Sequence, residues 1–232
     1  TVSNYRENDH PPFIWASPDA GATFRSINGD LRDEVVRTLT EDIKNQDVLY
    51  AGTESGIFVT LDRGRSWRRL RGDNFPNVRV DELTIHPREN ALLIASHGRA
   101  IWILDHLEPI QEYTAAQAAS GDARLYSIPN ALQWKSKDDR NDEFWGHQYL
   151  VGENPPTDAV MQFHFKRAVA NPPLRISDAG GRVVRELTIP ANRNQPGIQT
   201  VCWDQRVQPI EAPDFDTPDP AGRGGGAAGR GA

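Results

Sequence analysis

Apolar residues in this chain come in short runs interrupted by Asp, Gly, Asn and Pro, and the longest runs, 91–95 and 100–104, have five residues. Runs of this length between turn residues predict β-strands rather than helices. Around position 163, apolar residues alternate with Gln162 and His164, which predicts a half-buried strand with His164 on its exposed side. The pattern therefore predicts a mostly β chain, and no run is long enough to cross a membrane.

The composition changes three times along the chain. Residues 1–110 carry most of the strand-like runs, and residues 111–122 predict a short helix or a linker. Strand-like alternation returns over 143–206. Residues 207–232 are rich in Pro and then Gly without apolar periodicity, so a flexible tail is expected.

Charge and cysteine content exclude several classes of function. The 232 residues include 26 Lys and Arg against 32 Asp and Glu, a net charge of −6, which argues against nucleic acid or anionic lipid as partner. Cys202 is the single cysteine and no Cys/His cluster has zinc spacing, so no metal or cofactor is expected. The chain begins at Thr1 without a leader-like segment, which predicts a mature chain or a piece of a longer one.

Two segments of eight residues repeat one pattern. Residues 17–24 read SPDAGATF and residues 60–67 read TLDRGRSW, so both fit S/T-x-D-x-G-x-S/T-aromatic. They start 43 residues apart, which matches the period of about 40–45 residues of a four-stranded propeller blade. This pattern is the Asp-box, or BNR repeat.

The residue types of the box suit a turn between two strands of a blade. The hydroxyl and the carboxylate can accept hydrogen bonds from backbone amides that the turn leaves unpaired, and the glycine permits positive φ. The aromatic residue is expected to fill the gap between neighbouring sheets. We therefore predict a structural role, rather than catalysis or calcium binding, for Ser17, Asp19, Gly21, Phe24, Thr60, Asp62, Gly64 and Trp67.

The chain around and after the second box resembles a known family. The GTESG, HPREN and SHGRAIWILD segments at 52–56, 86–90 and 96–105 are similar to the last blades of bacterial BNR-repeat proteins labelled sortilin/VPS10-like or glycosyl hydrolase. Three residues differ from those common in that family: Ser96 replaces a Thr, Ala100 replaces a Gly and His106 replaces an Asp.

Further downstream, residues 123–126, 174–185 and 197–206 resemble the C-terminal immunoglobulin-like module of these proteins, which is of the FlgD type. Gln205 stands where Leu is common. The resemblance implies an all-β chain with the terminal blades of an Asp-box β-propeller followed by an Ig-like β-sandwich that is incomplete in this chain.

The implied domains are two to three propeller blades over 1–110, a linker with a connecting strand over 111–142, a partial sandwich over 143–206 and the tail over 207–232. So few blades cannot close a ring. The resemblance therefore implies that the remainder of the propeller, or another chain, completes the sheets, whose edges are otherwise unpaired.

The resemblance also implies a function. We expect an exported bacterial protein, secreted, periplasmic or on the cell surface, that acts as a binding or scaffold protein for peptide, protein or glycan. His97, Arg99 and Trp145 are the candidate binding residues. The alternatives are that Arg99 pairs with a carboxylate such as Asp105, that His97 caps a backbone carbonyl, and that Trp145 packs against a neighbouring sheet.

Two other functions remain open. A glycoside hydrolase needs two suitably spaced carboxylates, for which Asp81 with Glu82, Glu54 and Asp105 are candidates. A sialidase needs a tyrosine nucleophile and a cluster of arginines. Tyr50 and Arg99 are present as candidates, but they do not make up the full set of residues. No motif assigns these residues a catalytic role, so a catalytic site is expected mostly outside this segment. The second alternative is a structural subunit of a cell-surface assembly.

Overall fold

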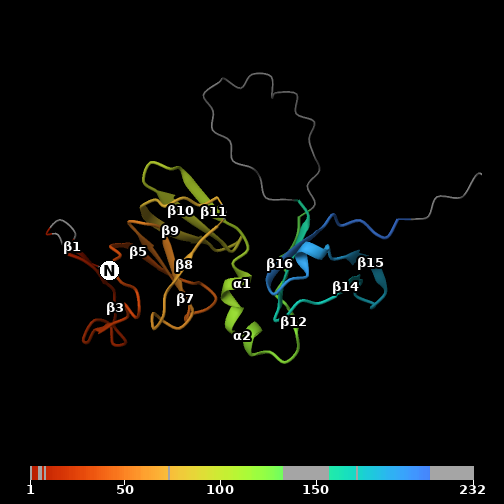
Figure 1. Ribbon diagram of the computed structural model, residues 1–232, viewed down its shortest axis with the longest axis horizontal. Helices are drawn as coiled ribbons and strands as arrows, with labels where there is room; N and C mark the ends of the chain where they lie inside the picture. The colour runs from red at the N-terminus through yellow and green to blue at the C-terminus, as the bar shows by residue number, and fades with distance from the viewer. Residues whose placement is uncertain are drawn as a thin grey trace, which may run out of the picture.

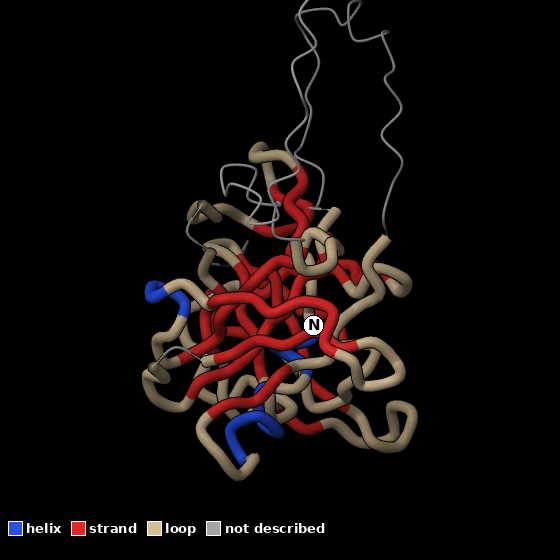
Figure 2. The backbone as a smooth tube through the Cα atoms, turned by 90° about the vertical axis from the view of Figure 1, so that its right-hand side faces the viewer, coloured by secondary structure: helices blue, strands red, loops and turns tan. Residues whose placement is uncertain are grey.

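The computed structural model describes residues 2–4, 7, 9–72, 74–132, 157–170 and 172–209 (Figure 1). Trp145 and residues 210–232 of the expected tail lie outside these ranges. The described chain is nearly all β, with antiparallel sheets and a few short helical segments, as Figure 2 shows. Neither α-helix in these ranges has the length and hydropathy that a membrane span requires.

The N-terminal part forms three groups of strands, which we call blades 1, 2 and 3. Blade 1 has two strand pairs, β1 (Val2–Asn4) with β2 (Asp9–Phe13) and β3 (Trp15–Ala16) with β4 (Arg25–Ser26). Blade 2 is a four-stranded meander of β5 (Val36–Glu41), β6 (Leu49–Thr53), β7 (Ile57–Thr60) and β8 (Arg68–Leu70). Blade 3 has β9 (Val80–His86), β10 (Ala91–Ser96) and β11 (Ile101–Leu104). The sheets do not close into a ring within the described residues.

Blades 2 and 3 pack face to face around a hydrophobic core. Tyr50, Ile57 and Leu92 are almost completely buried in it. Strand β6 approaches β9 so closely at Gly52 that a Cβ there would stand 2.8 Å from the Val80 side chain. Glycine at this position therefore sets the spacing of the two sheets.

Blades 1 and 2 are joined through Trp67, which follows the second Asp-box turn. Its side chain is 6% exposed and packs with Ile14, Ile27 and Leu31 of blade 1. Its indole Nε1 donates a hydrogen bond of 3.0 Å to the Ile27 carbonyl oxygen. A Cβ on Gly64 would stand 2.5 Å from the same oxygen, so the turn can dock this closely only with glycine.

A buried polar network attaches the helical connection to blades 2 and 3. Gln111 Nε2 donates to Asp42 Oδ2 (2.8 Å) after β5 and to Asn90 Oδ1 (2.9 Å) before β10. Asn90 Nδ2 in turn donates to Glu108 Oε1 (2.7 Å). These hydrogen bonds hold α1 (Glu108–Gln111) on the blades, and α2 (Tyr113–Ala118) follows it. Within residues 111–122, where a short helix or a linker was expected, the structure has the helix α2, and α1 ends at Gln111 just before it.

The C-terminal part has two antiparallel sheets, which Figure 1 places on the far side of α1 and α2 from the blades. One sheet has the order β12 (Ala123–Leu125), β13 (Ala159–Phe165), β16 (Gly197–Trp203). The other pairs β14 (Pro173–Ser177) with β15 (Val183–Thr188), and a 3-10 turn, η3 (Ala191–Arg193), precedes β16. The strand expected in the linker is β12, and it belongs to the C-terminal sheet because it pairs with β13.

Strand β13 differs from the half-buried strand that its alternation predicts. Six of its seven residues are buried, and His164 is 4% exposed rather than at the surface. Helix α2 covers the polar side of the strand, where the Tyr113 ring meets the imidazole edge to face, with centroids 5.6 Å apart, and Gln117 Nε2 lies 3.0 Å from His164 Nε2. The expectation of an exposed His164 was wrong because a helix outside the strand buries it.

Phe24 also departs from its prediction. It occupies the Asp-box position of Trp67, but its side chain is 67% exposed and fills no gap between sheets. Its ring instead lies over its own turn, 3.8 Å from where a Cβ on Gly21 would stand. The aromatic position of the box is buried only where a blade lies in front of it.

This difference gives a matched test of blade packing. Trp67→Ala should lower the free energy of unfolding by about 3–5 kcal/mol, because it empties the space between blades 1 and 2. Phe24→Ala removes an exposed ring from the same motif position and should change it by no more than about 0.5 kcal/mol. Urea unfolding followed by circular dichroism measures both, and equal losses would contradict the packing described.

Candidate functional site

The loops of blades 2 and 3 divide between two edges of the sheets. Because neighbouring strands are antiparallel, every second connection lies at the same edge. One edge has the start of β5, the β6–β7 turn at 54–56, the segment before β9 and the β10–β11 turn at 97–100. We call this the loop edge. The Asp-box turn at 61–67 and the β9–β10 turn lie at the opposite edge.

A pocket of about 450 Å³ opens at the loop edge. Charged side chains of both signs line it. Arg37 pairs with Glu54 through its Nε at 2.5 Å, and the Ser55 hydroxyl donates to Glu34 Oε1 at 2.7 Å. The lining residues are His10, Asp33, Glu34, Val35, Arg37, Glu54, Ser55 and Arg79.

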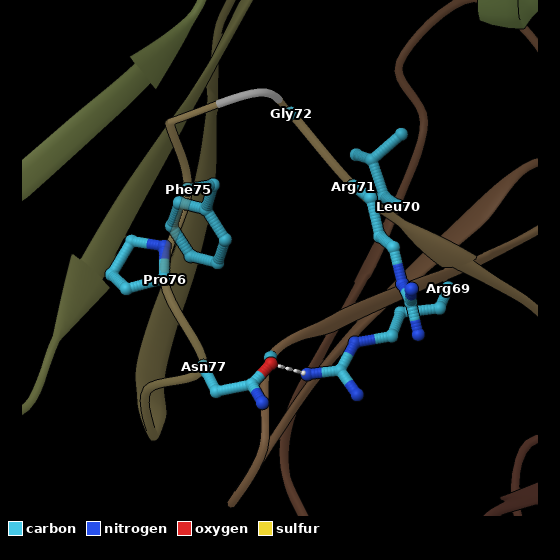
Figure 3. Close-up of a pocket in the computed structure, with 8 residues that line it drawn as sticks. Arg69, Leu70, Arg71, Gly72, Phe75, Pro76 and Asn77 are labelled. Atoms are coloured by element: carbon cyan, nitrogen blue, oxygen red, sulfur yellow. Dashed lines mark hydrogen bonds between the residues drawn. The ribbon is translucent and has the colours of Figure 1, made fainter.

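A second, smaller pocket of about 260 Å³ lies on the other side of the β6–β7 turn. Figure 3 shows Phe75 and Pro76 on one side of it and Arg69 and Arg71 on the other. Arg69 donates to Asn77 Oδ1 at 2.5 Å and to the Ser55 carbonyl oxygen. Arg69 therefore ties the β8–β9 loop to the β6–β7 turn that separates the two pockets.

His97 lies at the loop edge beside the Arg79 segment. Its amide donates to the Arg79 carbonyl oxygen (2.9 Å), and its imidazole Nδ1 lies 3.3 Å from Asp81 Oδ2. Arg79 Nε is 2.6 Å from the other oxygen of Asp81. The hydrogen bond from Arg79, with a smaller contribution from His97, lowers the pKa of Asp81 below its usual value.

These contacts differ from the alternative pairings considered for His97 and Arg99. The His97 imidazole faces a carboxylate rather than a backbone carbonyl. Arg99 uses its carbonyl oxygen to accept a hydrogen bond of 2.7 Å from Trp102 Nε1. Among the described residues, its guanidinium forms no ion pair with Asp105.

The second Asp-box turn, between β7 and β8, is closed by its own side chains. Thr60 Oγ1 accepts a hydrogen bond from the Gly64 amide (2.9 Å), and Asp62 Oδ1 accepts from the amides of Arg65 and Ser66 (3.0 and 2.9 Å). The Ser66 hydroxyl donates to Asp62 Oδ2 (2.6 Å). Both carboxylate oxygens are therefore occupied within the turn.

The first Asp-box turn, between β3 and β4, repeats this geometry. Ser17 Oγ accepts from the Gly21 amide (2.6 Å), and Asp19 accepts from the amide and the hydroxyl of Thr23 (2.8 and 2.7 Å). Gly21 and Gly64 have φ of 96° and 82°, the left-handed region that glycine enters freely. These are the hydrogen bonds that the turn chemistry of the motif predicts.

Three of the residues considered for hydrolysis, Tyr50, Glu54 and Asp81, are placed unfavourably for it. Tyr50 is completely buried, and burial together with the nearby Asp42 raises the pKa of its phenol, so it cannot reach a substrate as a nucleophile. Glu54 is paired with Arg37, and Asp81 has a lowered pKa where a general acid needs a raised one. In the described ranges, no three His, Cys, Asp or Glu side chains are grouped to hold a metal ion.

The arginines of the loop edge were not singled out from the sequence. Arg37, Arg69 and Arg79 each stand within or beside a predicted strand, where an arginine ordinarily indicates a solvated face. Arg37 meets Glu54 from 17 positions away. The sequence gives only one sign that these arginines lie together. Both blade 2 and blade 3 have an arginine close to a turn.

The comparisons with known proteins give one match. The family model Sortilin-Vps10, described as "Sortilin, neurotensin receptor 3", matches residues 13–143, more than half of the chain. The matched range includes both Asp-box turns and all of blades 2 and 3. No curated protein and no solved structure matches the chain.

The hydrogen bonds of the second turn predict a pH-dependent contribution to stability. Burial by itself raises the pKa of Asp62, but the hydrogen bonds from Ser66, Thr60 and Arg65 outweigh it and bring the pKa below 3.8. Since the folded pKa is depressed, the contribution is complete well above 3.8 and is lost as the pH falls through the folded value. Asp62→Ala should cost about 1.5–3 kcal/mol at neutral pH, and thermal melts should show this cost shrinking in acid.

The control for that series is Asp33→Asn, at an exposed carboxylate outside both turns. Its melting temperature should follow the wild type across the same pH range. A cost of Asp62→Ala that does not change with pH would contradict a stabilising charge on the carboxylate.

The β10–β11 turn contains a residue in an unfavourable backbone conformation. Ala100 has φ of 64°, where an L-residue other than glycine is strained. Ala100→Gly should therefore raise the free energy of unfolding by about 0.5–1 kcal/mol, whereas Ala95→Gly inside β10 should lower it by a similar amount. Chemical denaturation checks both, and a destabilising Ala100→Gly would overturn this reasoning.

Proposed function

Because this chain belongs to the Sortilin-Vps10 family, which indicates a propeller-type binding domain, we propose that its loop edge binds a polar ligand. The proposed role is that of an exported binding or scaffold protein that is not catalytic in this segment. Peptide or protein is the first choice of ligand and glycan the second.

The observation that carries this proposal is the balance of charges in the larger pocket. Arg37 and Arg79 stand beside Glu54 and Asp81, so the loop edge offers hydrogen-bond donors and acceptors next to each other. Peptide groups and sugar hydroxyls both donate and accept hydrogen bonds, and such a lining suits them better than an apolar ligand. His97 extends the same edge, and Arg99 lies in the same turn.

The C-terminal sheets extend the proposal to the rest of the chain. We take them to be an Ig-like module of the FlgD type that supports the blades, and the protein to be a bacterial one that works outside the cytoplasm. The tight turn between β14 and β15 supports this, since Asp178 Oδ1 accepts hydrogen bonds from the Gly180 and Arg182 amides, both at 3.0 Å. Glycoside hydrolysis and a structural role in a surface assembly stay the alternatives.

A peptide library and a glycan array, each probed with the whole chain, test the proposal. The ligands they identify should bind at least about tenfold more weakly to Arg37→Gln and to Arg79→Gln, because each change removes a charged hydrogen-bond donor from the pocket. Arg88→Gln is the matched control, since Arg88 is an exposed arginine at the opposite end of β9. Circular dichroism establishes that the variants fold.

Two results would count against the proposed function. Equal binding by wild type and both pocket variants would place the ligand elsewhere on the chain. Hydrolysis of chromogenic glycosides that a single carboxylate change abolishes, with folding intact, would establish the enzyme alternative.

A further inference from the structure

The negative net charge of the chain conceals a local concentration of arginines. Residues 63–71 contain no Asp or Glu and five arginines, which are Arg63, Arg65, Arg68, Arg69 and Arg71. We call these nine residues the arginine segment. It runs from the second Asp-box turn through β8 into the β8–β9 loop, so it crosses blade 2 from the edge with the Asp-box to the loop edge.

The arginine segment forms the outer edge of blade 2. Among the described strands, β8 is the last of its sheet and pairs with β7 alone. Arg65, Arg68 and Arg71 are exposed, and we call them the three exposed arginines. Blade 2 lies between blades 1 and 3, because β5 is in contact with β1 and with β9. A neighbouring blade packs on a face of a sheet, so this outer edge is open to a ligand.

The carboxylates close to the arginine segment already have other partners. Asp62 accepts hydrogen bonds from the amides of its own turn, and Asp30 Oδ1 accepts one of 2.6 Å from the Trp67 amide. Asp47 pairs with Arg63 Nε at 2.5 Å. Within the described part of the chain, no carboxylate forms an ion pair with any of the three exposed arginines. Their positive charges are therefore available to an external anion.

At the loop edge the arginine segment ends in the smaller pocket. Arg69 donates there to two uncharged acceptors, the Ser55 carbonyl oxygen and Asn77 Oδ1. Figure 3 places the guanidinium groups of Arg69 and Arg71 on the same side of the pocket, opposite Phe75. Two positive charges on one wall repel each other, and an anion bound in the pocket relieves this repulsion.

We propose that the arginine segment binds an acidic polysaccharide, a chain of sugars that bear carboxylate or sulfate groups. Guanidinium groups form paired, charge-assisted hydrogen bonds with such anions. A polymer fits because the three exposed arginines are distributed from one edge of blade 2 to the other, which a single small anion does not span. The pocket also offers the Phe75 ring to the apolar face of a sugar.

Nucleic acid fits this surface less well. A duplex carries one negative charge per about 1.7 Å of its axis, and the other surfaces of a chain with a net charge of −6 repel it. Single strands gain affinity from aromatic rings on which successive bases stack. Phe75 is the one aromatic residue among the described residues that line the pocket, so it provides no series of such rings.

Binding of the whole chain to immobilised polygalacturonate and to dextran sulfate, measured by biolayer interferometry, tests the proposal. This test is independent of the ligand proposed for the larger pocket. The wild type should bind at least one of the two acidic polymers at least about tenfold more tightly than unsubstituted dextran. Rising salt should weaken that binding, because contacts between exposed charges are screened. Comparison of the two polymers identifies carboxylate or sulfate as the preferred anion.

Two triple variants locate the binding surface. The first removes the charges of the three exposed arginines by Arg65→Gln, Arg68→Gln and Arg71→Gln, and its affinity for the acidic polymer should fall by at least about tenfold. The control removes the same number of charges from exposed arginines elsewhere, by Arg88→Gln, Arg182→Gln and Arg206→Gln, and should bind as the wild type does. Arg69 is left in place because it ties the β8–β9 loop to the β6–β7 turn.

Thermal melts establish that both triple variants fold, and Arg68→Gln and Arg71→Gln are measured singly if the first does not. Three outcomes would overturn the proposal. They are a wild type that binds neither acidic polymer more tightly than dextran, a control variant that loses as much affinity as the first, and tighter binding to a single-stranded DNA oligonucleotide. The last outcome would assign the arginine segment to nucleic acid.

Discussion

The contact between the second Asp-box turn and blade 1 is the interaction on which the arrangement of the blades depends. Trp67 fills the space between the two blades, its amide donates to Asp30 Oδ1 (2.6 Å), and Gly64 lets the turn come against the Ile27 backbone. The carboxylate of Asp62 closes the same turn from within. One segment of eight residues thus closes the β7–β8 hairpin and joins blade 2 to blade 1.

The second Asp-box turn and the loop edge lie at opposite edges of the sheets. The loop edge has the pockets, the paired charges of Arg37 and Glu54, and the Arg79–Asp81–His97 group. The opposite edge has the turn hydrogen bonds, and the network around Gln111 anchors α1 there. Antiparallel connectivity separates these two groups of residues, because every second connection lies at the same edge.

Much of the fold was predictable because its causes are local in the chain. Short alternating runs indicated strands, and the two motifs indicated the hairpins β3–β4 and β7–β8. The burial of particular side chains was not predictable in the same way. Phe24 and Trp67 occupy one motif position with opposite exposures, and His164 is buried by a helix on another segment. Each outcome depends on what lies in front of the residue, which no local pattern contains.

The sequence by itself determined the all-β character, the blade period and the hydrogen bonding of the two turns, since these need only residues within a few positions of each other. The tertiary structure alone decided which charges meet, which apolar faces are covered and which are left exposed. Arg37 meets Glu54 through strand pairing, and Ile101 stays exposed because it lies on the face of β11 opposite to the core on which Trp102 packs. The physical reason is that burial and ion pairing depend on separation in space, whereas turn chemistry depends on separation along the chain.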